Sequence, residues 1–169
     1  MTSSGRLFPI LDPSAYQFRL EEIGWALSGI CRFTAQCHEH YSVAQHSIHV
    51  ANLLPPHLRF AGLMHDASEA YLGDVSQPLK QLLPEYKAIE RRVERAIGVQ
   101  YNVDMFNPLV KTADVHALAV ERLALMPVGH DAWWPTVSPE LPVLPVDPWA
   151  RKRAFSEWMA EVRSFWTGA

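Results

Sequence analysis

The chain lacks the features that mark secreted and membrane-spanning proteins. Its only two cysteines, Cys31 and Cys37, are too few for a disulfide scaffold and too widely spaced for a CxxC pair. The N-terminus has no apolar stretch like that of a signal peptide, and no uncharged apolar run approaches the roughly 18 residues that span a bilayer. We therefore expect a cytosolic protein that does not enter a membrane and whose thiols have no dedicated role.

Positive charge is also scarce. The 15 basic residues are outnumbered by 18 acidic ones, so no global positive field exists to attract a nucleic acid polymer. Any polyanionic ligand must be held locally. Hydrophobic residues make up 49% of the 169 residues, as in globular proteins, and this length suits one domain better than two.

Helical periodicity dominates what is present. Apolar residues at spacings of three and four predict a helix over 20–30, and an irregular loop follows over 31–41. Ser42 can cap a second helix, which ends near Leu54 before a pair of prolines. Similar signals predict helices over about 58–71, 84–97, 108–126 and 149–166.

No segment alternates like a strand, so the sequence predicts an all-α, compact, single-domain helical bundle over residues 1–169. Its core is expected over about 20–126, with a proline-rich segment and a C-terminal helix over 127–169.

Two groups of residues are interpreted as structural. A charge run on the helix over 84–97 is expected to form a solvated outer face: Glu90, Arg91, Arg92, Glu94 and Arg95. The aromatic tail is expected to pack onto the helical core or between subunits through Trp133, Trp134, Trp149, Trp158 and Trp166.

Potential metal ligands and acids lie on the predicted helices, beside core-forming residues. His46 is on the second helix, His65, Asp66 and Glu69 are on the third, and Asp114 is on the fifth. Burying such groups is costly without a partner, and a cation is an efficient one. Two imidazoles and two carboxylates suit zinc, cobalt, manganese or iron better than magnesium, which prefers oxygen ligands.

Such an ion lowers the pKa of bound water and polarises a phosphoryl oxygen. Glu69 follows Asp66 by three residues, so on a helix it shares the side of Asp66 and can act as a general acid or base. Each residue taken alone also has a structural interpretation: His46 as a core histidine, His65 and Asp66 as a local pair, and Asp114 as a partner of Lys111. The hypothesis depends on the whole set.

The ordered pattern of His46, then His65 and Asp66, then Asp114 resembles the metal signature of HD-domain phosphohydrolases. The surrounding segments resemble the small deoxynucleotidase branch, which includes bacterial 5'-deoxynucleotidases and phage dATP triphosphohydrolases. The similarity covers roughly residues 24–126, and the short interval between His46 and His65 is more similar to phage members. The matching segments are YSVAQHS (41–47), HDASEAYLGDV (65–75), PLK (78–80) and KTAD (111–114).

The resemblance implies an HD-type bundle in which His46, His65, Asp66 and Asp114 bind the catalytic metal and Glu69 assists the water. The metal would be zinc, cobalt or manganese, with magnesium as an additional phosphate-bound ion.

It also implies substrate contacts outside the metal shell. Arg32 would contact phosphate, Phe33 would stack on the base, and Pro78 would close the other side. The remaining candidates are Asp74 for a sugar hydroxyl, and Lys80 and Lys111 for further phosphates.

The function implied is metal-dependent hydrolysis of a deoxynucleoside phosphate, foremost a dNTP such as dATP. A triphosphate is favoured because Arg32, Lys80 and Lys111 together carry more positive charge than one phosphate requires. A 5'-deoxynucleotidase acting on dNMPs is the near alternative. A nucleotide sensor without turnover and a phosphodiesterase are the others. We expect a homo-oligomer, a dimer or larger, in the cytoplasm of a bacterium or a phage-infected host. A second soft metal site at Cys37, His38 and His40 is not favoured, because their spacing does not suit a closed zinc site.

Overall fold

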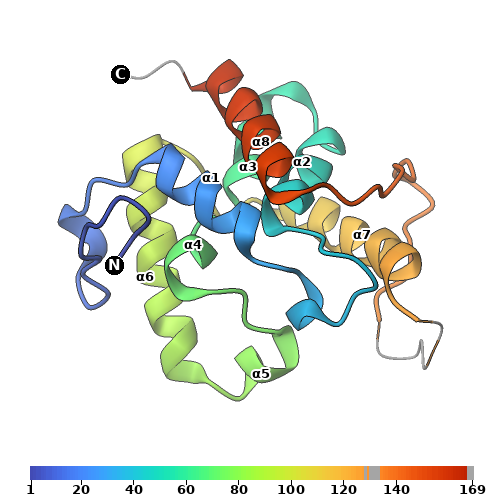
Figure 1. Cartoon of the computed structure of the whole chain (residues 1–169), viewed down its shortest axis with the longest axis horizontal. Coiled ribbons are helices and arrows are strands. Elements are labelled where there is room, and N and C mark those ends of the chain that lie inside the picture. The colour runs from blue at the N-terminus through green and yellow to red at the C-terminus, as the bar shows by residue number, and fades with distance from the viewer. Residues whose placement is uncertain (128, 130–133, 167–169) are drawn as a thin grey trace.

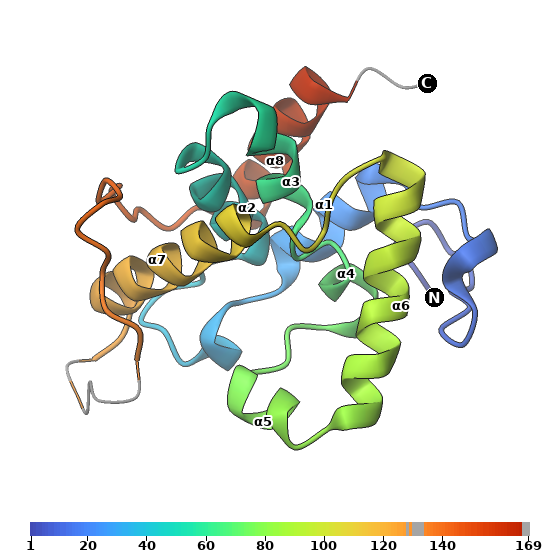
Figure 2. The ribbon, with the colours of Figure 1, turned by 180° about the vertical axis from the view of Figure 1, so that it is seen from behind.

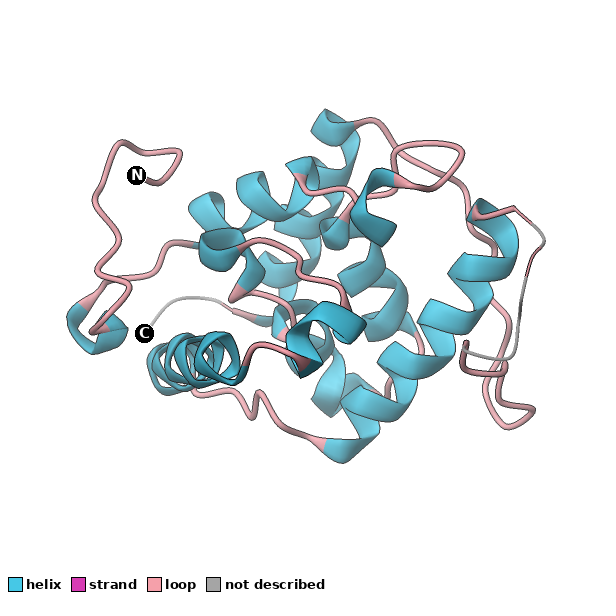
Figure 3. Ribbon diagram, turned by 90° about the horizontal axis from the view of Figure 1, so that it is seen from below, coloured by secondary structure: helices cyan, strands magenta, loops and turns pink. Residues whose placement is uncertain are grey.

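Helices and short 3-10 turns provide the regular secondary structure of residues 1–127, 129 and 134–166, which the computed structural model describes (Figures 1 and 3). Within those residues, extended backbone pairs only at an isolated bridge between Cys31 and Ser42. The prediction of an all-α helical bundle is confirmed.

The α-helices in chain order are α1 (Leu20–Gly29), α2 (Val43–Asn52), α3 (Arg59–Met64), α4 (Glu69–Leu72), α5 (Gln77–Gln81), α6 (Pro84–Tyr101), α7 (Pro108–Leu125) and α8 (Arg151–Phe165). Three 3-10 turns accompany them: η1 (Pro13–Ala15), η2 (Phe33–Ala35) and η3 (Pro56–Leu58).

Local signals placed most helix ends correctly. The Ser42 hydroxyl accepts a hydrogen bond from the Gln45 backbone N–H at 3.2 Å and caps α2 as predicted. Pro108 lies in the first turn of α7, and the Asn107 side chain caps that helix. The helix from Pro84 continues to Tyr101, four residues beyond the predicted minimum.

The prediction of one helix over 58–71 is wrong. The chain forms α3 and α4 with a tight turn over 65–68 between them. Backbone N–H groups there bond three residues back instead of four, from Ala67 to Met64 and from Glu69 to Asp66, both at 2.9 Å. His65 and Asp66 therefore lie in a turn at the end of α3, not within a continuous helix.

The C-terminal helix α8 is part of the main core, because it packs against α1, α2 and α3 (Figures 1 and 2). Trp158 is fully buried, and its indole N–H donates to the Leu63 carbonyl at 3.2 Å. Gly24 of α1 faces this ring, and a Cβ there would lie 2.7 Å from it. Only glycine lets α1 and α8 approach so closely.

The predicted packing of the aromatic tail onto the core is confirmed for Trp158 and Trp166. The Trp166 ring stacks on Phe60 with centroids 5.9 Å apart and an angle of 10° between the planes. Trp133 lies outside the described residues.

The charge run on α6 divides into two groups. Arg91, Arg92 and Arg95 are exposed, as predicted. Glu90 and Glu94 are half-buried, which corrects the expectation of a wholly solvated face. The Glu90 carboxylate accepts a hydrogen bond from the Lys80 ammonium, on α5, at 2.7 Å.

No helix in the described ranges is both long enough and apolar enough to cross a membrane.

Candidate metal centre

Four of the predicted residues meet where α2, the turn after α3, and α7 come together (Figure 2). His46 lies on the buried face of α2, and Asp114 is on α7. His65 and Asp66 occupy the turn that follows α3. Gly62 allows α3 to lie against α2, since a Cβ there would be 2.9 Å from the Ala51 Cα.

The side chains present two nitrogens and carboxylate oxygens to one space. His46 Nε2 lies 3.1 Å from Asp114 Oδ1 and 3.7 Å from Asp66 Oδ2. His65 Nε2 lies 3.1 Å from Asp66 Oδ2 and 3.9 Å from Asp114 Oδ1. The ligand atoms of His46, His65 and Asp66 all lie within 4.8 Å of one another.

The orientation of His65 fits a metal ligand. Its Nδ1 is 2.8 Å from the Gly62 carbonyl, which can only accept, so Nδ1 carries the proton and Nε2 keeps its lone pair. That Nε2 atom is buried and has no hydrogen-bond partner in the described part of the chain, because its contact with Asp66 lacks hydrogen-bond geometry. A nitrogen lone pair aimed at carboxylates is suited to a borderline divalent cation.

Among the described residues, this is the only such meeting of three or more His, Cys, Asp or Glu side chains. Cys37, His38 and His40 do not form a second one there.

A buried carboxylate behind the cluster was missed from the sequence. Glu121 of α7 is fully buried, and its Oε1 accepts a hydrogen bond from His46 Nδ1 at 2.8 Å. Its Oε2 accepts from Arg32 Nε at 2.9 Å. Burial alone would raise the pKa of Glu121, but the charges of His46 and Arg32 bring that pKa below its ordinary value. The carboxylate therefore orients the His46 ring so that Nε2 faces the cluster.

The helical spacing of Glu121 in the sequence could have indicated that it is buried. Glu121 comes four residues after Ala117 and four before Leu125, so it occupies an inward position on the apolar stripe of α7. An acid at such a position must have buried partners.

Comparison with known proteins places this chain in a bacterial family. It is 37% identical to YfdR of Escherichia coli K12 over 161 residues, which cover 94% of this chain and 90% of YfdR. The chain belongs to the YfdR family. A protein of Rhodobacter capsulatus is 29% identical to it over 133 residues, covering 70% of this chain and 68% of that relative.

Both YfdR and the R. capsulatus relative are described only as uncharacterised proteins. No protein-family model matches the chain. The chemistry of this YfdR-family protein must therefore be inferred from the site itself.

Arg32 and Phe33 lie beside the metal ligands. Arg32 is buried, and its Nη1 lies 4.0 Å from Asp66 Oδ2 while Glu121 holds its Nε. Phe33 is half-buried and makes an edge contact with Trp134, with centroids 6.1 Å apart.

Glu69 and Asp74 add carboxylates close to the cluster. Glu69 is 6% exposed, and its Oε2 is buried with no hydrogen-bond partner within the described ranges. Burial foremost, and then the charges of Asp66 and Asp74, raise the pKa of Glu69 well above its ordinary value. Burial also raises the pKa of Asp74, which is half-buried.

The two predicted lysines are already paired with carboxylates. Lys80 Nζ donates to Glu90 at 2.7 Å and lies 3.7 Å from Glu69 Oε1. Lys111 Nζ donates to Asp114 Oδ2 at 2.7 Å from a side chain that is 73% exposed. Pro78 is exposed on α5, and its contact with a base stays a prediction.

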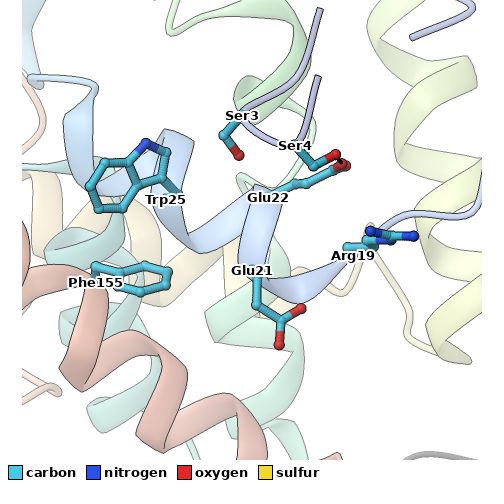
Figure 4. A pocket seen from close by; sticks show the side chains of 7 residues that line it. All are labelled: Ser3, Ser4, Arg19, Glu21, Glu22, Trp25 and Phe155. Atoms are coloured by element: carbon cyan, nitrogen blue, oxygen red, sulfur yellow. Dashed lines mark hydrogen bonds between the residues drawn. The ribbon is translucent and has the colours of Figure 1, made fainter. Parts of the chain in front are cut away.

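The surface pocket in Figure 4, of about 450 Å³, shares no residue with this cluster. Its one buried acid, Glu22, accepts hydrogen bonds from Ser4, from Thr2 at 3.0 Å and from Tyr16 at 2.9 Å. Those partners satisfy the carboxylate, so this pocket shows no chemistry comparable with the metal cluster.

Proposed function

We propose that this YfdR-family protein is a metal-dependent phosphohydrolase of the HD type that acts on a deoxynucleoside phosphate. The proposal depends on one observation, the convergence of His46, His65, Asp66 and Asp114 on one space from three elements.

The four residues would hold a divalent ion, which when bound supplies Lewis acidity toward water and a phosphoryl oxygen. Arg32 supplies positive charge for the phosphate. Because Glu121 holds its Nε, the guanidinium stays beside the cluster without having to be ordered by substrate.

Glu69 is proposed as the general acid or base. Its Oε2 has no hydrogen-bond partner among the residues that the structure describes, so that atom is available to take a proton from an attacking water. Burial moves the pKa of the Glu69 carboxyl toward neutral pH, and a group with such a pKa can both accept and return a proton.

A dNTP is the first substrate that we propose, because the Lys111 side chain, although it donates to Asp114, is 73% exposed and can turn toward further phosphates beside Arg32. The 5'-deoxynucleotidase alternative has support from Lys80. Its ammonium is paired with Glu90 at 2.7 Å, which reduces the charge available for further phosphates.

Hydrolysis assays would test the proposal directly. The purified chain is incubated with dNTPs, dNDPs and dNMPs, with cobalt, manganese or magnesium, and products are separated by chromatography. We expect turnover in the wild type and loss of at least 100-fold in Asp114→Asn. Glu157→Gln, at an exposed position on α8, is the matched control.

The substrate that is consumed separates the alternatives. Release of phosphates from dNTPs supports the triphosphohydrolase, and release from dNMPs alone supports the deoxynucleotidase. Cleavage of cyclic dinucleotides alone would replace the proposal with a phosphodiesterase. Nucleotide binding without turnover would replace it with a sensor, and neither binding nor turnover would overturn it.

A further inference from the structure

The two cysteines lie close together in the structure, although their spacing in the sequence is too wide for a CxxC pair. Cys31 Sγ and Cys37 Sγ are 3.6 Å apart, and both side chains are half-buried. A disulfide bond is about 2 Å long, so a small side-chain adjustment would join the two sulfurs.

Contacts outside the intervening loop hold both ends in place. Cys31 pairs with Ser42 in the antiparallel bridge. On the other side, the His38 backbone N–H donates to the Leu125 carbonyl at 2.9 Å. Because tertiary contacts already close this loop, a crosslink would require little further ordering of the chain.

An unusual backbone turn brings the Cys31 and Cys37 thiols together. Phe33, Thr34 and Ala35 have φ values of 55°, 51° and 60°, in the left-handed region that residues other than glycine rarely adopt. Three such residues in succession reverse the chain tightly enough to bring Cys37 back to Cys31. The fold thus maintains a costly conformation whose direct result is the pairing of two thiols.

We infer that Cys31 and Cys37 form an oxidation-sensitive dithiol that closes to an intramolecular disulfide when a peroxide is present. One thiol loses its proton, and the thiolate attacks a peroxide oxygen, giving a sulfenic acid and a hydroxide ion that takes up the released proton to form one water. The second thiol attacks that sulfur, forms the S–S bond and releases a second water. Two thiols are oxidised by two electrons, and hydrogen peroxide is reduced to two waters.

Burial foremost raises the pKa of the Cys31 thiol, which lowers its share of thiolate at neutral pH. The disulfide would enclose Arg32 and Phe33 in its ring. Its formation does not depend on the proposed phosphohydrolase activity.

Thiol counting tests the inference without any nucleotide, since the chain has only two cysteines. The reduced, full-length protein is treated with hydrogen peroxide, quenched with an alkylating agent, and measured by intact mass. We expect both thiols to disappear together, with no alkylation or added oxygen, and dithiothreitol to restore both. Peptide mapping should find Cys31 linked to Cys37.

The unfolded chain is the matched control. In urea the two thiols are no longer held together. We therefore expect the disulfide to form at about one tenth of the native rate, or more slowly still. In Cys31→Ser, the remaining thiol should oxidise to a sulfenic or sulfinic acid. Equal rates in native and unfolded protein, or independent oxidation of the two wild-type thiols, would overturn the inference.

Discussion

The His46 ring connects the proposed metal ligands on one side with the buried Glu121 carboxylate on the other. Its Nε2 faces Asp114 and Asp66, while its Nδ1 is held by Glu121. Glu121 also holds Arg32, so one buried carboxylate sets the orientation of a proposed metal ligand and of the proposed phosphate contact. This connection makes Glu121 more informative to mutate than a ligand itself.

Glu121→Gln is expected to weaken metal binding by about 10–100-fold, because an amide cannot replace both acceptor bonds of the carboxylate. Isothermal titration with cobalt or zinc measures the affinity. Glu157→Gln, whose side chain is 51% exposed in the wild type, should bind metal like the wild type. An unchanged affinity in Glu121→Gln would show that the ring orientation does not depend on this carboxylate.

Glu69→Gln is expected to lower kcat by at least about 100-fold while metal affinity stays within about twofold of wild type, because the amide cannot take a proton. Steady-state kinetics and titration calorimetry separate the two effects. Glu85→Gln, at an exposed position in α6, is the control. Full turnover in Glu69→Gln would remove this residue from the mechanism.

Among the elements, α6 shows how a polar surface helix acquires an inner acidic edge. Val93 and Ile97 face the core and are fully buried. Glu90 and Glu94 lie at the border of that face. Burial, and then the charge of Glu90, raise the pKa of Glu94 to about 7.

This shift gives α6 a pH-dependent effect on stability. The pKa of Glu94 in the folded protein exceeds its ordinary value of 4.5, so the folded state binds this proton more tightly than the unfolded state. The stability gained from that proton is fully present below pH 4.5 and is lost as pH rises through about 7. Glu94→Gln should therefore stabilise the protein at pH 8, by about 1 kcal/mol after solvent screening.

Thermal unfolding at a series of pH values measures that effect. A gain of about 1 kcal/mol corresponds to a rise in Tm of about 2–4 °C at pH 8, which should vanish below pH 4.5. Glu85→Gln should show no such pH dependence. An equal Tm change at both ends of the pH range would contradict the assignment to Glu94.

On the scale of the whole molecule, α8 links the end of the chain to the elements that carry the site. Trp158 is its central contact, because it is fully buried and bonded to α3, the helix that precedes His65. The stability of the site is therefore coupled to a helix that contributes no ligand.

Trp158→Ala is expected to lower the free energy of unfolding by about 3–5 kcal/mol, through lost burial and the cavity left behind. Urea denaturation followed by circular dichroism measures this change. Phe106→Ala, at a ring that is 54% exposed, should change stability by only about 0.5 kcal/mol. A Trp158→Ala variant as stable as the control would show that α8 is not part of the cooperative core.

The expected homo-oligomer stays a prediction, which light scattering coupled to size-exclusion chromatography would test. A monomer over a wide concentration range would contradict it. The expected cytoplasmic location likewise stays a prediction.

The sequence by itself determined the longer helices and most of their ends, although not α5, because caps such as Ser42 and prolines such as Pro108 act on backbone groups within a few residues. It also identified His46, His65, Asp66 and Asp114 as a candidate set through their ordered pattern. Both depend on information that is local or linear.

Only the tertiary structure decided which side chains meet. Contacts between elements turned Glu90 toward Lys80 and placed Glu121 behind His46, and they hold the ends of the loop in which Cys31 meets Cys37. Helical periodicity indicates which face of an element is buried, but the partner across that face is set by long-range packing, which no local spacing encodes.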